Sequence, residues 1–427
     1  MKKKLILLGV SLLLLSNSLY AQAMRTGRSV AVAESGTMAM YGANAVGWNA
    51  ANLGLKANPV SSLVFASFGM SLGNNAFSPQ YISDNFVEGD TLDDAQKNDI
   101  LSQMDADQLR IYALIGIPAF GLSISHYALN VDAHILATAA IPADIFELAL
   151  TGPKVGVFYD LSTVEEASMA YVTSSLSAAQ PLSAIPFTQE FSVGASFKYV
   201  KGLAYGELEH KEGMFQVNQQ TLHAEGYFRT LTSTLGDGVA MDLATAAKLN
   251  YRDIYVGLTL GNLIGDITWE DVEASENRFY RNDGLSVDSL TKKDYWRNFM
   301  TESDTTYSYG SVKTPLPRYM IIAADLPYMS GKGDLFLSYF QGLNDAPGQN
   351  TTPRIGFGTE FRWIPILPLR VGMAVGGIEG SMYSAGFGLR LLGYQMNFGA
   401  AWQRGILAGA EGFSIGISNY FGPGFKR

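Results

Sequence analysis

The C-terminal part of the chain alternates apolar and polar residues with a period of two. In 354–363, the residues Ile355, Phe357 and Phe361 fall on one face, and Gly356 and Glu360 fall on the other. Successive side chains of a β-strand point to opposite faces, so this period predicts strands. The same pattern recurs at 369–376, 383–391, 394–403 and 413–421. Each stretch is close to the roughly 9–11 residues of a strand that crosses a bilayer at a tilt.

The two faces of these expected strands differ in chemistry. The apolar faces begin or end in aromatic residues such as Trp363, Tyr383, Trp402 and Phe421, and such rings favour the lipid–water interface. The opposite faces carry Arg, Glu, Gln, Asn, Ser and Gly, which suit a polar lumen. Alternation alone also fits a soluble antiparallel barrel or sandwich. The whole pattern predicts an all-β fold, a closed antiparallel transmembrane β-barrel of about 14–16 strands.

The N-terminus has the layout of a secretory signal peptide at 1–23. Three lysines precede the apolar stretch Leu5–Leu15, and the small residues Ala21 and Ala23 mark the cleavage site. The chain contains no cysteine, which excludes a lipidated cysteine and a disulfide framework. No later stretch offers the ~18 apolar residues of a transmembrane helix. A bacterial outer-membrane location follows, with outer-membrane lipid and the barrel-assembly machinery as expected partners.

Charge and motif content argue against several function classes. Removal of the signal peptide takes the net charge from −9 to −12, which disfavours nucleic acid as a partner. No two of the four histidines have metal-ligand spacing, so we expect no metal site and no cofactor. Ser125, His126 and Asn130 lie close in sequence, with Ser123 nearby. Proximity in sequence does not define a catalytic triad, and we predict that the protein is not an enzyme.

The segment 24–59 is rich in small residues and asparagine and does not have a strand pattern. Within it, Tyr41–Gly54 resembles the N-terminal segment of FadL-like outer-membrane proteins, in which a Gly/Ala run precedes an Asn-Pro-Ala-Gly-Leu-Ala type motif. The matching residues are Asn49, Ala51 and Leu53, and the departures are Ala50, Asn52 and Gly54. The resemblance implies a hatch that plugs the barrel lumen. The alternative is a flexible leader before the first strand.

Two groups of residues are candidates for ligand binding. In the expected hatch these are Asn44, Trp48, Asn49 and Asn52. On the expected lumen wall they are Arg354, Arg362, Arg370 and Arg390, which share the inward face with Glu360. One interpretation of these arginines is a charge network that braces the wall. The other is a basic site for a carboxylate head group.

The remaining chain is assigned to the barrel, 60–421, and a C-terminal tail, 422–427. Counted back from Phe421, connections alternate between short turns and long loops. This count makes the longest, 265–317, an extracellular loop. Its clustered charge and aromatic residues such as Trp269 and Tyr307 make it the candidate for a surface cap. In the N-terminal half we expect strands at 60–72, 110–117, 120–127 and 131–140. A short helix over 91–101, capped by Thr91, is expected in the insertion between the first two.

The likeness to FadL-like barrels extends in pattern over essentially the whole mature chain. It implies passive transport of hydrophobic or amphipathic small molecules across the outer membrane, with a hydrophobic small molecule as ligand. Two alternatives remain open at this point. One is a non-transporting barrel that serves a secretion machine as a shuttle or partner, and the other is a structural surface protein.

Overall fold

The computed structural model describes residues 19–20, 25–87, 92–104, 107–183, 185–218, 222–280 and 301–422. Most of the expected signal peptide, the middle of the expected 265–317 loop and nearly all of the expected tail lie outside these residues. Within them, no helix is long and apolar enough to span a membrane.

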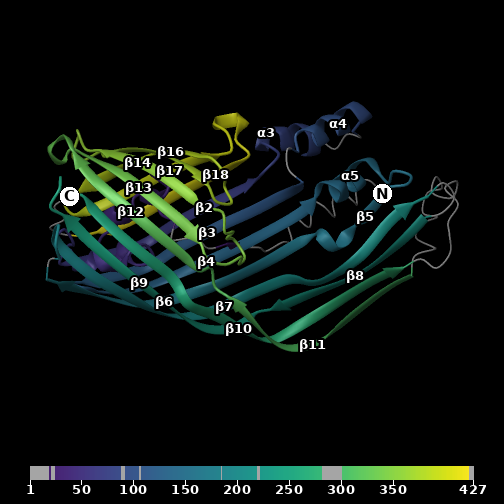
Figure 1. Cartoon of the computed structure of the whole chain (residues 1–427), viewed down its shortest axis with the longest axis horizontal. Coiled ribbons are helices and arrows are strands. Elements are labelled where there is room, and N and C mark those ends of the chain that lie inside the picture. The colour runs from purple at the N-terminus through teal and green to yellow at the C-terminus, as the bar shows by residue number, and fades with distance from the viewer. Residues whose placement is uncertain are drawn as a thin grey trace.

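Fourteen antiparallel strands close into a barrel (Figure 1). Closure is made by the last strand, β18, which pairs with the first barrel strand, β2, from Gly412↔Gly73 to Phe421↔Leu63. The predicted fold class and strand number are confirmed. The barrel strands are β2 (Ser61–Asn74), β3 (Gln108–Ile124), β4 (Tyr127–Pro142), β6 (Glu165–Leu182), β7 (Thr188–Val217), β9 (Leu235–Leu249), β10 (Tyr255–Tyr280), β12 (Tyr319–Tyr328), β13 (Gly333–Gly342), β14 (Arg354–Phe361), β15 (Leu369–Gly376), β16 (Met382–Leu391), β17 (Tyr394–Gln403) and β18 (Gly412–Phe421).

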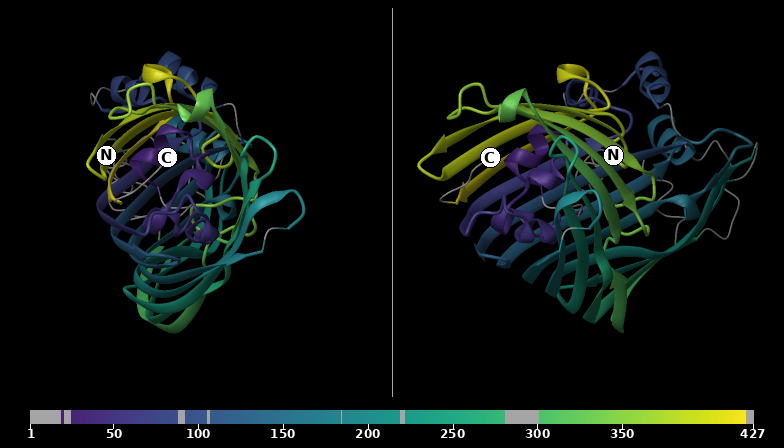
Figure 2. Two further views of the ribbon diagram at one scale, coloured as in Figure 1. Left: turned by 90° about the vertical axis from the view of Figure 1, so that its left-hand side faces the viewer. Right: turned by 60° about the vertical axis from the view of Figure 1, so that its left-hand side comes forward.

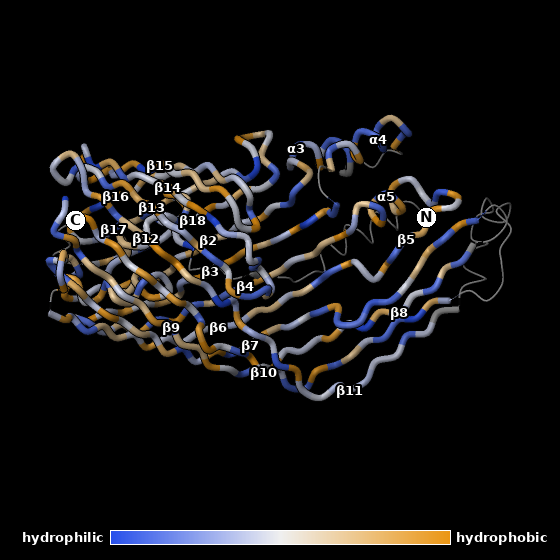
Figure 3. The backbone as a smooth tube through the Cα atoms, viewed as in Figure 1, coloured by the Kyte–Doolittle hydropathy of each residue, from blue (hydrophilic) through white to orange (hydrophobic). Residues whose placement is uncertain are grey.

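The alternation along the strands sorts side chains between lumen and exterior as expected. On β14, Arg354 and Glu360 are buried, whereas Ile355 and Phe357 are 45% and 51% exposed. The same apolar exterior continues on neighbouring strands, and apolar and polar positions alternate along the tube in Figure 3. A continuous apolar outer surface is what a barrel presents to lipid.

Part of the sheet continues beyond the barrel as an extension. The second half of β7 pairs with β8 (Leu222–Ser233), β8 pairs with β10, and β10 pairs with β11 (Thr301–Pro315). Figure 1 shows this extension projecting to one side. The expectation that 265–317 is a loop is therefore wrong for its described parts, which form paired strands. Asp266 pairs with Pro315, and the ladder continues to Tyr280↔Thr301. Residues 301–309 are rich in Thr, Ser and Tyr, which fit a pleated, half-exposed strand.

Two minor strands lie outside the ring of fourteen. Strand β5 (Phe158–Asp160) pairs with the extended part of β7. Strand β1 (Leu19–Tyr20) falls within the expected signal peptide and pairs with Leu136 and Ile135 of β4.

Short turns gather at one end of the barrel, which we call the turn end, and longer connections gather at the other, the loop end. Turns such as 125–126 and 392–393 lie at the turn end. The loop-end connections carry short helices: α3 (Pro79–Ile82), the π-helix η4 (Ser83–Val87), α4 (Asp94–Ser102), α5 (Ala143–Thr151), η5 (Leu161–Thr163) and η9 (Leu407–Gly409), whereas η8 (Met329–Gly331) lies in a turn.

Two local expectations are corrected. Helix α4 is capped by Asp93, not Thr91, because the Asp93 carboxylate accepts from the Gln96 backbone N–H and Gln96 bonds back to Asp93. The expected strands 110–117 and 120–127 are one strand, β3, whose pairing with β4 shifts between Pro118 and Phe120. A bulge bends a strand without ending it.

The segment before β2 lies inside the barrel, as predicted, and we call 25–59 the hatch. It folds into α2 (Gly27–Ala31) and the 3-10 helices η1 (Thr37–Ala39), η2 (Gly42–Ala45) and η3 (Ala50–Gly54). Helix α2 contacts β15–β18 and β2, η1 contacts β10, β12 and β13, η2 contacts β2–β4, and η3 contacts β6, β7 and β9. Contacts on all sides place the hatch in the lumen, where Figure 2 shows it in purple.

Glycines on the wall let the hatch backbone come close. A β-carbon at Gly194 of β7 would lie 2.5 Å from the Ala51 nitrogen, and one at Gly372 of β15 would overlap the Val32 carbonyl carbon. Only a residue without a β-carbon fits at such positions. The inward glycines of the alternating strands therefore serve hatch packing.

Candidate functional site

The hatch anchors to the wall through the Trp48 and Asn49 region. Trp48 is buried in an apolar cluster with Met38, Leu55 and Tyr319. Its carbonyl accepts from the Thr259 hydroxyl at 2.8 Å. Asn49 caps η3 and donates its amide to the carbonyls of Thr245 (3.0 Å) and Leu258 (3.4 Å). These two candidate ligand residues are used to hold the hatch against β9 and β10.

The other two hatch candidates differ from each other. Asn52 donates its amide to the carbonyls of Thr37 (3.0 Å) and Met40 (2.8 Å), so it ties η3 to η1 within the hatch. Asn44 is half-buried in η2. A buried amide that satisfies two carbonyls replaces water that the hatch excludes. Asn49 and Asn52 are thus accounted for by the structure of the hatch.

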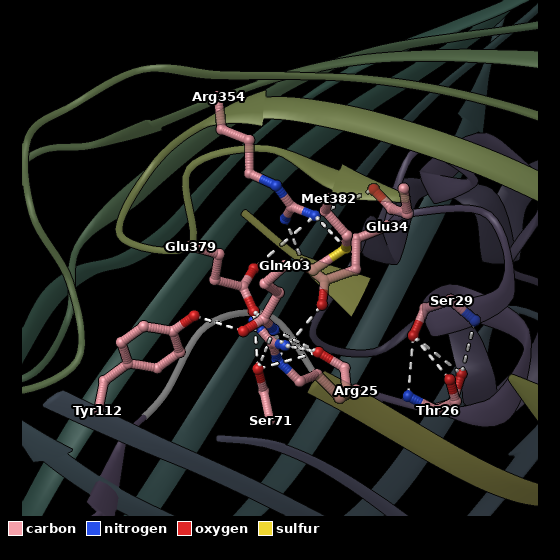
Figure 4. Close-up of polar contacts among 12 residues, drawn as sticks. Arg25, Thr26, Ser29, Glu34, Ser71, Tyr112, Arg354, Glu379, Met382 and Gln403 are labelled. Carbon is pink, nitrogen blue, oxygen red and sulfur yellow. Dashed lines mark hydrogen bonds and ion pairs between the residues drawn. The ribbon is translucent and has the colours of Figure 1, made fainter. Parts of the chain in front are cut away.

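A balanced ion network lies at the loop-end side of the hatch (Figure 4). Arg25 of the hatch contacts Glu34 at 3.2 Å and Glu379 at 2.8 Å. Arg354 of β14 pairs with the same two carboxylates. Glu379 belongs to the short connection between β15 and β16, so the network joins the start of the hatch to the wall. All four side chains are nearly inaccessible to solvent, and buried charges are held only when paired.

Neutral polar groups complete this network. Ser71 donates to Glu379 at 2.8 Å, and Gln403 donates its amide to Glu379 at 2.8 Å and to Ser414 at 2.7 Å. The Tyr112 hydroxyl donates to the Gln403 carbonyl oxygen. Strands β2, β3, β17 and β18 are therefore tied to one buried carboxylate.

A second, asymmetric ion network lies at the turn end and centres on Glu360. The four arginines around this carboxylate are Arg28 (3.1 Å), Arg362 (2.9 Å), Arg370 (2.7 Å) and Arg390 (2.8 Å). Arg362 also pairs with Asp334 of β13. Three of the four predicted wall arginines thus meet here, whereas Arg354 belongs to the loop-end network. Arg28 comes from α2, so this network also fastens the hatch to the wall.

Apolar side chains fill the lumen beside the hatch, toward the extension. Trp269 of β10 stacks on Tyr205 of β7 with ring centroids 5.2 Å apart. Both belong to a buried cluster with Leu136, Met169 and Leu231 from β4, β6 and β8. Trp269, expected in a surface loop, is fully buried inside the barrel. We call this cluster the luminal apolar cluster.

The wall is irregular next to the start of the hatch. Pairing between β2 and β3 is interrupted from Phe65↔Phe120 to Gly69↔Gly116. Adjacent register shifts occur in β18 after Ile417 and in β3 after Pro118. Asn419 donates its side-chain amide to the Ala66 carbonyl at 2.9 Å. One side chain thus bridges a place where three neighbouring ladders are disturbed.

The polar residues considered for catalysis are used elsewhere. Ser123 is hydrogen-bonded to Ser62 at 2.7 Å. Asn130 donates to the Ala43 carbonyl of the hatch at 3.0 Å, and Ser125 lies in the β3–β4 turn. No group of three or more His, Asp or Glu in the described part of the chain could hold a metal ion.

On the extension, beyond the barrel rim, Glu276 is held by four groups. Its carboxylate accepts from the hydroxyls of Tyr227 (2.6 Å) and Tyr307 (2.8 Å) and contacts Arg229 and Arg278. The Tyr227 hydrogen bond, followed by that of Tyr307, lowers the pKa of Glu276 to about 2. Hydrogen bonds to the charged form favour that form.

We expect these contacts to survive mild acid. Because the pKa is lowered by folding, the stabilisation is present above the usual glutamate pKa and is lost as the pH falls toward about 2. A carboxyl NMR titration of Glu276 should give a midpoint near 2 in the native protein and a higher midpoint in Tyr227→Phe. A native midpoint near the usual value of about 4.3 would contradict the assignment.

The fold and its interior define a class, a closed fourteen-strand barrel whose lumen is plugged by its own N-terminal segment. Three crystal structures share this fold over nearly their whole length. They are the toluene transporter TbuX of Ralstonia pickettii (10% identity, TM-score 0.51, 94% of this chain, 98% of that one), the toluene transporter TodX of Pseudomonas putida (10%, 0.53, 94%, 99%) and a FadL homologue of Pseudomonas aeruginosa (11%, 0.50, 95%, 99%).

The sequence comparisons are less specific. Residues 56–263 match a family of unknown function, DUF5723. No curated protein matches the chain. The FadL-type fold that the sequence pattern predicted is thus confirmed by structure, at identities that establish the fold alone.

Proposed function

We propose that the protein is an outer-membrane barrel for passive transport of hydrophobic or amphipathic small molecules. The luminal apolar cluster carries the proposal, because Trp269 and Tyr205 place stacked aromatic rings inside a lumen that also holds the hatch. Binding sites for small apolar ligands are lined mainly by such side chains. The FadL-like fold, shared with two toluene transporters, supports the same class of solute.

In this proposal the solute enters at the extension end, contacts the luminal apolar cluster and leaves near the hatch. The disturbed ladders of β18, β2 and β3 mark a place where the wall can open with a small loss of free energy, because few inter-strand hydrogen bonds must break there. The exit therefore leads sideways, past Asn419 and Ala66. The two ion networks keep the hatch in place during passage.

A reversible bridge across this part of the wall tests the route. The chain has no cysteine, so Ala66→Cys and Ala119→Cys can be joined selectively by a cleavable bis-maleimide. Bridging should reduce toluene uptake by cells at least fivefold, and cleavage should restore it. A bridge between Phe357→Cys and Met373→Cys, which pair directly on the regular β14–β15 ladder, is the matched control. Equal uptake with either bridge would contradict an exit at the wall.

A further inference from the structure

Positive charge exceeds negative charge in the buried turn-end network. Four guanidinium groups meet the carboxylates of Glu360 and Asp334 among the described residues. Asp325 of β12 supplies a further inward carboxylate near this network, because Pro327, two residues along the same strand, pairs with Asp334. With Asp325 included, three carboxylates face four guanidinium groups, so positive charge is still in excess. A buried charge without a counter-charge is strongly destabilising.

The hydrogen-bonding capacity of Glu360 is used up. One carboxylate oxygen contacts Arg362 and Arg390, and the other contacts Arg28 and Arg370. Donors are nevertheless left over, because Nη1 and Nη2 of Arg370 and Nε of Arg390 have no hydrogen-bond partner. A guanidinium group carries five N–H donors and no acceptor, so the arginines cannot satisfy one another and these donors still lack an acceptor.

Two of the four arginines are partly accessible. The side chains of Arg28 and Arg390 are 13% and 15% exposed, whereas that of Arg370 is 0% exposed. An incoming group can therefore reach Arg28 and Arg390 but not Arg370, whose positive charge still adds to the local potential. Arginine is the side chain best matched to carboxylate and phosphate.

We infer that the exposed edge of the turn-end network is a binding site for an oxyanion, a carboxylate or phosphate group, contacted by Arg28 and Arg390. Arg370 acts as a positioning residue through its charge. The source of the group is either the carboxylate of an amphipathic solute or free phosphate. The first source rests on the proposed function, whereas the site itself does not.

A substitution at Asn397 can neutralise part of the excess positive charge without changing the shape of the side chain. A β-carbon at Gly388 would lie 2.9 Å from Oδ1 of Asn397 and 3.2 Å from Nη1 of Arg370. That Oδ1 atom has no hydrogen-bond partner. Asn397→Asp is isosteric and places a permanent carboxylate near Arg370, so it should raise the thermal midpoint and weaken oxyanion binding.

The test is calorimetric titration of the full barrel in zwitterionic nanodiscs at fixed ionic strength. Probes are sodium octanoate, inorganic phosphate and octan-1-ol. We expect saturable binding of octanoate, phosphate or both, at least tenfold weaker in Arg390→Gln and Asn397→Asp and unchanged in the exposed control Arg110→Gln. Octanol should not distinguish the variants. Saturation by phosphate alone assigns the site to free phosphate, and saturation by octanoate alone assigns it to the solute.

Three results would overturn the inference. They are no saturable binding of either anion, equal affinity in the native protein and in both variants, and equal weakening in Arg110→Gln. If Arg390→Gln does not form a folded barrel, Asn397→Asp decides the matter alone. Toluene carries no anion, so its uptake tests the proposed function separately. Normal toluene uptake without anion binding would remove this site and leave the proposed function standing.

Discussion

Glu360→Gln is expected to lower the free energy of unfolding by about 3–5 kcal/mol, the usual cost of removing one partner of a buried ion pair. Glu360 is fully buried and is the carboxylate shared by four arginines, which come from α2, from the turn directly after β14, from β15 and from β16. Glutamine keeps the size of the side chain but leaves the guanidinium groups to repel one another. Denaturant unfolding from lipid vesicles measures the change.

Glu165→Gln is the matched control, since Glu165 is an exposed residue at the start of β6. Its effect should stay within about 0.5 kcal/mol, as for most surface substitutions. A loss below about 1 kcal/mol for Glu360→Gln would show that the four arginines do not depend on this carboxylate.

Deletion of 24–58 is expected to turn the plugged barrel into an open one. The hatch contacts strands on every side of the lumen, and a ring of fourteen strands is wider than its own side chains can fill. Entry of small hydrophilic solutes should therefore rise by at least about tenfold, while toluene uptake should fall. Liposome swelling with a pentose measures the first effect, and cell uptake measures the second.

The deletion variant must first migrate as a heat-modifiable band, because closed barrels resist detergent until boiled. A correctly inserted variant with unchanged permeation of both solutes would mean that the segment does not control the lumen. The hatch would then be structural only.

The C-terminal strands could be predicted from sequence because the local alternation of apolar and polar residues decides which way each side chain points. Ile355 and Phe357 face outward and Gly356 faces inward, and a slip of one residue would reverse all three. Loop lengths then fixed which strand ends lie together. The hatch was predicted from the small residues of 24–59 and the resemblance of Tyr41–Gly54.

Non-local pairings could not be predicted in the same way. Arg25 and Glu379 are far apart in sequence, and nothing near either residue indicates its partner. The count of connections places Trp269 in the longest loop, yet pairing with β9 and β11 turns its side chain into the lumen. The inward alternation of Tyr205 and Trp269 was the available signal for the luminal apolar cluster.

Selectivity of the native protein is the most direct measurement of the proposed transport. Cells with a lipopolysaccharide outer membrane are required, because plain phospholipid bilayers pass toluene unaided. Initial uptake of labelled toluene and of a pentose should be compared with and without the protein, at matched amounts of the heat-modifiable band. We predict faster toluene uptake and unchanged pentose uptake. Unchanged toluene uptake, or a parallel rise for both solutes, would contradict a plugged barrel that carries hydrophobic molecules.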